Sequence, residues 1–562
     1  MRFVSLFLLL AGCSQSSLPG NSDGSVASPD AGDGGVAATD AGDGGDACST
    51  TVAAAPGLVV TDRGPVQAVT DASTWAYFAI PYAAPPVAEL RWRPPQPHAC
   101  WSTPIANTTF GSSCVQLSAS DATQVIGAED CLTLNVWAPT TATATSALPV
   151  LVFIHGGGNV QGMASEMRDG LPLYDGAALA AQTNGIVVTF DYRVGPLAWL
   201  ASSAFAGENT HASTGNYGLL DQLAVLGFVQ RNIAAFGGDP AQVLLFGQSA
   251  GALDVCALVA SPLGKGLFAG ALMESGGCTA ATSATAQSFA DTFAAKVGCT
   301  SGDVAGCLRA LDAKTVELAI PEVADIAGSS APDFAPNADG WVLTDVPQNV
   351  LAAGQHNHVP VIIGSNEDET GQVEVTAYPN GMTSAQFTTA LMTYCGGNQT
   401  LAAAVAAEYP AADYGGDLRA AYIALTSDSK FICPARSIAR TLVAQQTEPV
   451  RRYQYTHTLD GAPLGATAAA EGASHGQELL MLFRQLDFGS YQASAGELSL
   501  ADAIDGYWSR FAATGDPNGA SAVTWPLYDA ANDTVLLLDD TQAAANGVRT
   551  AQCDFWAQAL GH

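Results

Sequence analysis

Runs of consecutive apolar residues recur along the chain and alternate with stretches of helical periodicity. Residues 148–155 read LPVLVFIH, residues 185–192 read GIVVTFDY and residues 359–364 read VPVIIG. Residues 218–236 and 250–259 have the apolar spacing of helices. Strands that are apolar at every position are typical of a parallel sheet covered on both faces. The pattern predicts an α/β fold with a large, mostly parallel central sheet flanked by helices.

One apolar run leads directly into a serine between two glycines. Residues 243–246 read VLLF, and Gly247, Ser249 and Gly251 follow before the helix. A strand, a Gly-x-Ser-x-Gly sequence and a helix in this order are typical of a nucleophile elbow, which exposes the serine hydroxyl at the carboxyl edge of the sheet. Glycines suit so sharp a turn because they have no Cβ. The motif alone also occurs by chance, so Ser249 is a candidate nucleophile that needs support from the rest of the chain.

A glycine-rich loop follows the strand at residues 148–155. An acyl-transfer nucleophile needs N–H groups aimed at the oxyanion, and Gly157 and Gly158 of the sequence HGGG can present theirs without an intruding Cβ. Ala250, directly after the serine at the start of the helix, offers a third donor. We expect His155 to be structural, because the general base in a fold of this kind lies near the C-terminal end of the chain.

The net charge of the chain restricts the kinds of macromolecule that it can bind. The 562 residues include 52 Asp and Glu against 20 Lys and Arg, so the formal net charge is -32. Such a surface repels phosphate backbones, which argues against a nucleic-acid partner.

The N-terminus predicts export. Arg2 precedes an apolar stretch over residues 3–10 that is too short to span a bilayer, and the sequence LAGC ending at Cys13 resembles the bacterial lipoprotein signal. That resemblance implies a signal peptide over residues 1–12, acyl chains on Cys13 that enter a lipid bilayer, and anchoring at the outer membrane or cell surface rather than the inner membrane. Residues 13–47 then form the lipidated cysteine and a disordered tether rich in Gly, Ala, Ser and Asp. The alternative is an ordinary signal peptide and a secreted protein.

Several separated segments together resemble the type-B carboxylesterase family of the α/β hydrolases, over nearly all of residues 58–560. Besides HGGG and GQSAG, they are FAIPYAAPPVAELRWRPPQP at 78–97, EDCLTLNVWAP at 129–139, DYRVG at 191–195, the segment 215–240 and FAATGDPN at 511–518, in family order. The resemblance implies an α/β-hydrolase fold over residues 48–562, as a single catalytic domain with loop and helix insertions that form the pocket.

The same resemblance supplies partners for Ser249. GSNEDETG at 364–371 is similar to the segment that carries the acid, which implies Glu369, with Glu367 and Asp368 as neighbouring alternatives. ASHGQELLMLF at 473–483 is similar to the segment that carries the base, which implies His475. A Ser-His-Glu triad of this kind forms an acyl-enzyme and needs no cofactor.

No metal site is expected from the sequence. His356 and His358 lie close together, but no further ligands stand near them and no His-Glu-x-x-His motif occurs.

Twelve cysteines are consistent with an exported protein. The family resemblance implies three disulfides, and the remaining cysteines allow two more pairs, with Cys395 left over. The implied pairs are Cys114–Cys131, Cys299–Cys307 and Cys433–Cys553; the further pairs are Cys256–Cys278 and Cys48–Cys100.

Two departures from the cholinesterase pattern restrict the range of expected substrates. Residues 115–130 contain no aromatic residue to hold a quaternary ammonium, and Gln248 stands where cholinesterases have Glu. We therefore expect a serine esterase of uncharged small-molecule carboxylic esters. The alternatives are a specialised hydrolase of a natural product, polyester or carbamate, and a non-catalytic surface recognition protein. The sequence does not predict an oligomeric state.

Overall fold

The computed structural model describes residues 48, 52–71, 73–168, 170–326, 334–520 and 522–560. The predicted signal peptide, Cys13 and the tether through residue 47 lie outside these residues. In the described part of the chain, no helix is both long enough and apolar enough to cross a bilayer.

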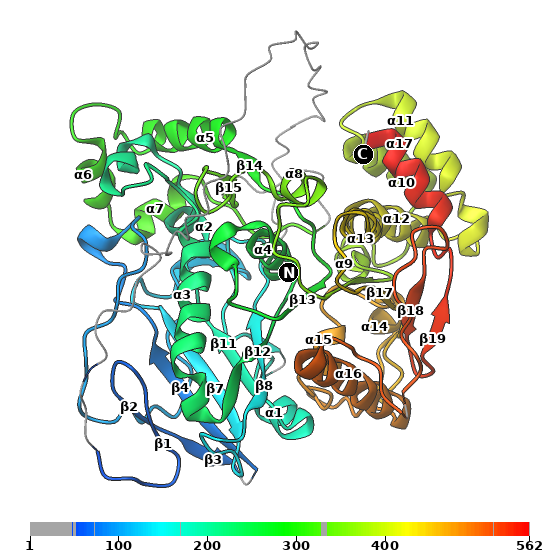
Figure 1. Ribbon diagram of the computed structural model, residues 1–562. Helices are drawn as coiled ribbons and strands as arrows, with labels where there is room; N and C mark the ends of the chain where they lie inside the picture. The colour runs from blue at the N-terminus through cyan, green and yellow to red at the C-terminus, as the bar shows by residue number, and fades with distance from the viewer. Residues whose placement is uncertain are drawn as a thin grey trace, which may run out of the picture.

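One sheet of 11 strands runs through the protein, in the order β19-β18-β17-β16-β13-β12-β8-β11-β7-β4-β3 (Figure 1). Every adjacent pair from β18 to β11 is parallel, whereas β19 and the strands from β7 to β3 join antiparallel. The predicted parallel sheet is therefore its centre. The strands are β3 (Val69–Asp71), β4 (Thr74–Pro81), β7 (Thr133–Pro139), β8 (Leu148–Ile154), β11 (Ile186–Phe190), β12 (Gly238–Gln248), β13 (Gly270–Glu274), β16 (Val361–Asn366), β17 (Val450–Tyr455), β18 (Val535–Leu538) and β19 (Ala543–Ala545).

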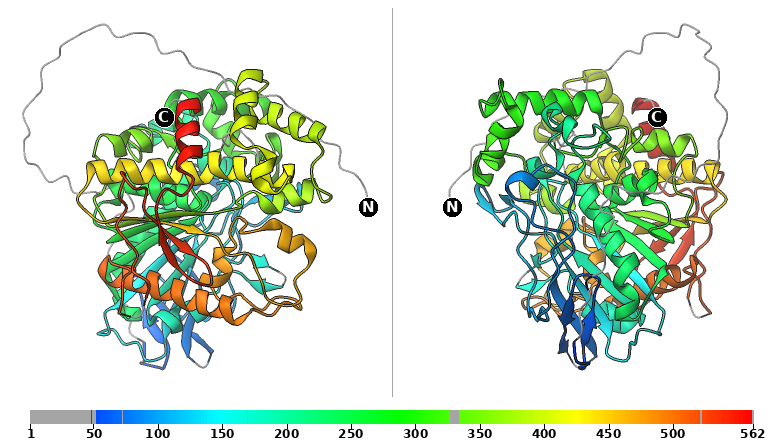
Figure 2. Two further views of the ribbon diagram at one scale, coloured as in Figure 1. Left: turned by 90° about the vertical axis from the view of Figure 1, so that its right-hand side faces the viewer. Right: turned by 60° about the vertical axis from the view of Figure 1, so that its left-hand side comes forward.

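Helices cover both faces of the sheet. One face carries α3 (Tyr217–Asn232), α4 (Ala250–Ala260) and α13 (Cys433–Gln445), with α8 (Pro347–Ala352) against α4 and α13. The other carries α1 (Ala177–Thr183), α15 (Glu478–Leu482) and α16 (Ala495–Thr514). In Figure 2 the orange α16 and the yellow segment that contains α13 lie on opposite sides of the sheet.

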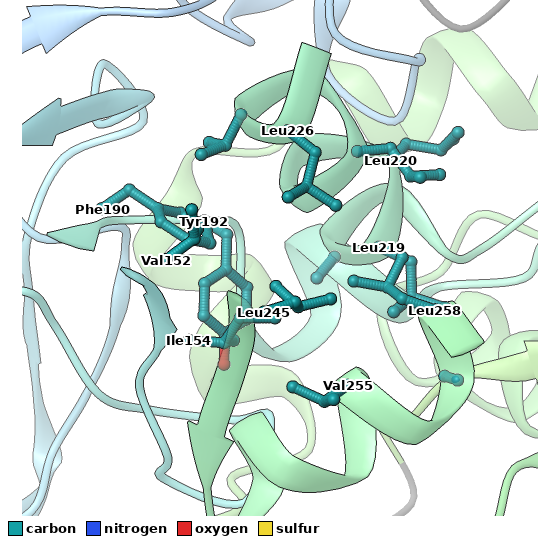
Figure 3. Packing of buried hydrophobic residues seen from close by; sticks show 14 of the residues in the cluster. Val152, Ile154, Phe190, Tyr192, Leu219, Leu220, Leu226, Leu245, Val255 and Leu258 are labelled. Carbon is teal, nitrogen blue, oxygen red and sulfur yellow. The ribbon is translucent and has the colours of Figure 1, made fainter. Parts of the chain in front are cut away.

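This two-sided burial explains the unbroken apolar runs. Successive side chains of a strand point to opposite faces. In β8, Val150, Val152 and Ile154 therefore belong to one core cluster, whereas Leu151 and Phe153 belong to another. Figure 3 shows Val152 and Ile154 packed with leucines of α3 and with α4.

A third core cluster forms a helical cap at the C-terminal part of the chain (Figure 1). It joins α10 (Ser384–Tyr394), α11 (Gln399–Glu408), α12 (Leu418–Ser427) and α17 (Thr550–Leu560), with Tyr409 and Trp556 in its interior. The turn between α12 and α13 is a π-helix, η6 (Asp428–Ile432).

The remaining elements are short or peripheral. The other α-helices are α2 (Gly195–Trp199), α5 (Ser283–Lys296), α6 (Val304–Arg309), α7 (Ala313–Ala319), α9 (Gly371–Ala377) and α14 (Ala466–Glu471). The two-stranded sheets pair β1 (Leu58–Val60) with β2 (Pro65–Gln67), β5 (Gln116–Ser118) with β6 (Asp121–Ile126), β9 (Met167–Arg168) with β10 (Leu171–Pro172), and β14 (Ala281–Thr282) with β15 (Asn337–Ala338).

Five disulfides join segments of the described chain, and they include the three implied by the family resemblance and the two further pairs. Cys395 is buried in the helical cap. The pairs are Cys48–Cys100, Cys114–Cys131, Cys256–Cys278, Cys299–Cys307 and Cys433–Cys553.

Candidate active site

Ser249 lies in the sharp turn between β12 and α4, as the sequence predicts. Its backbone has φ 59° and ψ -123°, a conformation that L-residues rarely adopt, and its N–H donates to the Glu274 carbonyl at 2.8 Å. A Cβ on Gly251 would lie 2.1 Å from the Ile154 oxygen, and one on Gly247 would lie 2.7 Å from the Gly251 carbonyl carbon. Both glycines are therefore needed for the turn to pass so close to β8.

The glycine loop after β8 passes beside the serine. Gly157 and Gly158 have φ values of 113° and 66°, and a Cβ on Gly156 would lie 2.9 Å from the Ser249 Cβ. Gly157, Gly158 and Ala250 line the same cavity as Ser249. The structure thus brings the three expected oxyanion donors to the nucleophile.

His155 lies outside that cavity lining. It is buried, its ring stacks on Tyr192 with centroids 4.4 Å apart, and its Nδ1 lies 2.9 Å from the Gly156 carbonyl. Burial lowers the pKa of His155 to about 4. A neutral packed imidazole agrees with the structural role expected for it.

Of the three neighbouring acids, Glu369 is the one that contacts His475. The His475 Nδ1 lies 2.5 Å from the Glu369 Oε2, and the other carboxylate oxygen accepts the Asn366 N–H at 2.8 Å. The Glu369 side chain is completely buried in the turn after β16. The structure therefore places the expected base and acid together, although 106 residues separate them.

The two alternative acids point elsewhere. Glu367 lies 3.8 Å from the Arg549 guanidinium and is partly exposed. Asp368 accepts the Ala473 N–H at 3.2 Å, which fixes the segment that carries His475. One acid therefore faces the imidazole, and its neighbour supports the loop that presents it.

The environment of His475 determines its charge. Burial lowers the pKa of His475, but the charge and hydrogen bond of Glu369 and the charge of Glu478 together raise it by more, so the net pKa lies above the usual value of 6.5. The Phe431 ring packs against the imidazole with centroids 5.0 Å apart. In the neutral ring, Nδ1 donates to Glu369 and Nε2 carries a lone pair.

That lone pair meets the residue that precedes the nucleophile. The Nε2 of His475 accepts from the Gln248 amide at 3.1 Å, and His475, Gln248 and Ser249 all line the cavity. The imidazole is thus held by Glu369 on one side and by the residue preceding Ser249 on the other.

Two further buried carboxyl groups lie close to this site, and neither is among the residues that the sequence predicts. The Asn366 side-chain amide donates to Glu478 at 2.5 Å, and the Trp508 indole donates to Glu274 at 2.9 Å. Burial, then the nearby Glu369 charge, raises the pKa of Glu478 to about 7, and burial also raises that of Glu274. Glu478 follows His475 by three residues, about one helical turn, and that spacing was the available signal.

The cavity in front of the site has a volume of about 720 Å³. It lies between the carboxyl edge of the sheet and the helical cap, since residues of both line it. Its large apolar and aromatic lining residues are Tyr174, Leu253, Phe289, Ile326, Tyr394, Leu401, Phe431 and Trp556.

The π-helix η6 adds charge to the cavity wall. Lys430 lines the cavity and donates to the Asp325 carbonyl at 3.4 Å, and Asp325 is itself a lining residue. Burial lowers the pKa of Lys430 to about 8. Helical periodicity does not indicate Lys430 as a cavity residue, because a π-turn shifts side chains off the α-helical register.

The other histidine clusters stand apart from the cavity lining. His356 contacts the Gln446 side chain at 2.9 Å, and its ring lies tilted against that of His358 with centroids 4.6 Å apart. His457, which the sequence reading did not single out, pairs through Nδ1 with Asp539 at 3.0 Å and Asp540 at 3.3 Å. These imidazoles are held by amide or carboxylate partners of their own.

Comparison with known proteins assigns the family. The profile described as "Carboxylesterase family" matches residues 50–556. The chain is 35% identical to the para-nitrobenzyl esterase of Bacillus subtilis (strain 168), over 86% of this chain and 94% of that protein. It is 33% identical to the fumonisin B1 esterase of Sphingopyxis macrogoltabida, over 84% of each. A solved PNB esterase structure matches with a TM-score of 0.74 and 32% identity, over 89% of this chain and 100% of that one. The chain therefore belongs to the carboxylesterase family of α/β hydrolases and is a carboxylic-ester hydrolase.

Proposed function

We propose that this hydrolase works through Ser249, His475 and Glu369. The His475 Nε2 takes the hydroxyl proton of Ser249 as the oxygen attacks the ester carbonyl carbon. The carbonyl oxygen becomes an oxyanion that accepts hydrogen bonds from the N–H groups of Gly157, Gly158 and Ala250. Glu369 stabilises the imidazolium and keeps its Nε2 directed at the reaction.

The ester bond breaks in the next step. The tetrahedral intermediate collapses, and His475 gives its proton to the departing alkoxide. The alcohol is released, and Ser249 remains as its acyl ester. Water then loses a proton to His475 and attacks the acyl carbonyl carbon. Collapse of the second intermediate returns the proton to Ser249 and releases the carboxylic acid, so that atoms and charge balance without a cofactor.

The contact between His475 and Glu369 carries this proposal. An imidazole that donates Nδ1–H to a buried carboxylate at 2.5 Å presents a basic Nε2 to the cavity that Ser249 also lines. The strained serine backbone and the glycine loop add the other two parts that acyl transfer requires.

We propose that the substrates are uncharged at the group beside the ester. The cavity wall carries the ammonium of Lys430, which repels a quaternary ammonium, although Asp325 in the same wall offsets part of that charge. The absence of aromatic residues from positions 115–130 agrees with this preference. The family relatives named for para-nitrobenzyl and fumonisin B1 esters indicate that the fold takes esters of different kinds.

Replacing Ser249 by Ala tests the mechanism. Because the triad acts as a unit, we expect Ser249→Ala and His475→Ala each to lower kcat by about 10⁵- to 10⁶-fold with the fold intact. An organophosphate should label wild-type protein at Ser249 and leave Ser249→Ala unlabelled. A folded Ser249→Ala variant that retains more than about 1% of the activity would refute the proposed nucleophile.

A panel of p-nitrophenyl esters tests the substrate class. Acyl length and bulk are varied, and acetylthiocholine is compared with its isosteric uncharged thioester. We expect the cationic ester to gain no advantage in kcat/KM. A marked preference for acetylthiocholine would overturn the proposed substrate class and leave the triad untouched.

We also propose that the protein is a lipoprotein anchored through Cys13. Two or three acyl chains, at about 0.8 kcal/mol per buried methylene, hold a protein on a bilayer far more firmly than one chain does. The acidic body, with a net charge of -32, adds no attraction to an anionic surface. Anchoring should therefore depend on Cys13 alone.

Fractionation of the native bacterial host tests the anchor. Wild-type protein should partition with membranes into detergent, whereas Cys13→Ser should be soluble and equally active. Wild-type protein found in the soluble fraction with a mature N-terminus other than an acylated Cys13 would show simple secretion instead.

A further inference from the structure

The proposed oxyanion donors come from two segments that only tertiary contacts hold together. Gly157 and Gly158 lie in the loop after β8, whereas Ala250 begins α4. Oxyanion donors act at about 2.7–3.1 Å, so a small shift between loop and helix weakens them. Some contact has to fix the loop against the helix.

Asn159, the residue directly after the two glycines, makes such a contact. Its side-chain Nδ2 donates to the Asp254 Oδ1 on α4 at 3.0 Å. Its backbone carbonyl accepts the Trp199 indole N–H and the Gly195 N–H, both at 2.8 Å. Asn159 has φ 63°, in the left-handed region that Asn tolerates better than most residues. Its backbone is therefore pinned on one side and its side chain is bonded to the nucleophile helix on the other.

Asp254 is an unusual residue to bury in a helix that packs against the sheet. It is fully buried, and its second oxygen accepts the Gln222 amide of α3 at 2.6 Å. Burial raises the pKa of Asp254 to about 7, and only the amides of Gln222 and Asn159 oppose that rise. A buried carboxyl held by neutral donors is a poor source of stability. Asp254 instead fixes the position of the Asn159 loop relative to α4.

We propose that Asp254 and Asn159 are positioning residues of the oxyanion hole, and that their hydrogen bond holds the Gly157–Gly158 loop against the nucleophile helix. The inference rests on the proposed function of Ser249 and the glycine loop. Both residues act through the loop backbone, so their loss should weaken the transition state more than substrate binding.

Four variants test this inference. Asp254→Leu removes the acceptor at similar size, and Asn159→Gly removes the donor while allowing the positive φ. Asp254→Asn retains an oxygen for Asn159, because the Gln222 amide can turn and offer its Oε1, which has no hydrogen-bond partner among the described residues. The fourth variant combines Asp254→Leu with Asn159→Gly. Asp505→Leu on α16 is the matched control, since Asp505 is also buried but pairs with Arg484 and does not line the cavity.

We expect Asp254→Leu and Asn159→Gly each to lower kcat by about 10- to 100-fold, with KM changed by less than about threefold. Asp254→Asn should stay within about fivefold of wild type, and the double variant should lose no more than the worse single variant. Affinity for a trifluoromethyl ketone, whose serine adduct carries an oxyanion, should fall in parallel with kcat/KM, whereas affinity for the alcohol product should not. Asp505→Leu should lower the thermal midpoint and leave kcat unchanged.

Three results would overturn the inference: unchanged kcat in Asn159→Gly, multiplicative losses in the double variant, or a trifluoromethyl ketone affinity that stays constant while kcat falls. If Asp254→Leu does not fold, Asn159→Gly and Asp254→Asn still decide the outcome. Ser249→Ala is measured in the same assays. If Ser249→Ala is inactive, the proposed function stands whichever way the Asp254 variants fall.

Discussion

For single residues, the proposed mechanism makes the charge on Glu369 the main control on the pH dependence of the enzyme. Burial lowers the pKa of His475, but Glu369, together with the charge of Glu478, raises it by more, to above 6.5. In the proposed mechanism His475 accepts the serine proton only when it is neutral, so kcat/KM should fall as the pH drops through this raised pKa. The midpoint of the acid limb should therefore lie above pH 6.5 in the wild-type enzyme.

Removing the Glu369 charge should shift the midpoint of the acid limb in the pH profile of kcat/KM. In Glu369→Gln the lowering by burial remains, whereas the raising charge is gone, so the midpoint should shift to lower pH. The rate should also fall, by about 10³- to 10⁴-fold, because the imidazolium loses its stabilising partner. The pH profiles of kcat/KM for the two proteins measure both effects, and a midpoint that stays in place or rises would contradict this account of His475.

At the scale of elements, the junction of β12 and α4 tolerates no side chain at Gly251. A Cβ there would lie 2.1 Å from the Ile154 oxygen of β8, so Gly251→Ala must push the elbow away from the sheet. Overpacking of this kind destabilises a protein by about 1–3 kcal/mol. We expect a lower thermal midpoint and a large loss of kcat, because Ser249 moves with the turn.

A second glycine provides the control for that variant. Gly207 in η2 (Ser203–Glu208) has no atom within 4 Å of an added Cβ, so Gly207→Ala should keep the wild-type midpoint and rate. If Gly251→Ala and Gly207→Ala have the same thermal midpoint and the same kcat, the close approach to β8 does not constrain the elbow.

At the scale of the whole molecule, the Cys433–Cys553 disulfide ties the C-terminal helix to the rest of the fold. It closes a loop of 120 residues, against 8 for Cys299–Cys307. The chain-entropy relation gives about 5 kcal/mol for the longer loop and about 2.5 kcal/mol for the shorter one. Replacing both cysteines of a pair by Ser should therefore lower the thermal midpoint more for Cys433–Cys553, as circular dichroism at one scan rate would measure. A larger effect of the Cys299–Cys307 pair would contradict this ranking.

Loss of that bond should also affect the site, because Trp556 of α17 lines the cavity. A raised KM for bulky esters, with little change for acetate esters, is the expected signature.

Short segments of the sequence suffice to predict the parts of this protein that are encoded locally. Apolar runs marked β8, β11 and β16, because strands buried on both faces need an apolar residue at every position. Gly247 and Gly251 marked the elbow, because only glycine fits the close approach to β8. The ordered family segments extended these signals to the fold, the ester chemistry and the candidates Glu369 and His475.

The packing of the whole chain sets the features in which residues far apart in the sequence meet. It separated Glu369 from Glu367 and Asp368 by the direction of one turn, and it joined Asn159 to Asp254 across 95 residues. It also placed Lys430 in the cavity wall through a π-turn. Local patterns report which face of an element is buried, whereas a hydrogen bond or a cavity wall depends on how several elements pack, and no single segment encodes that.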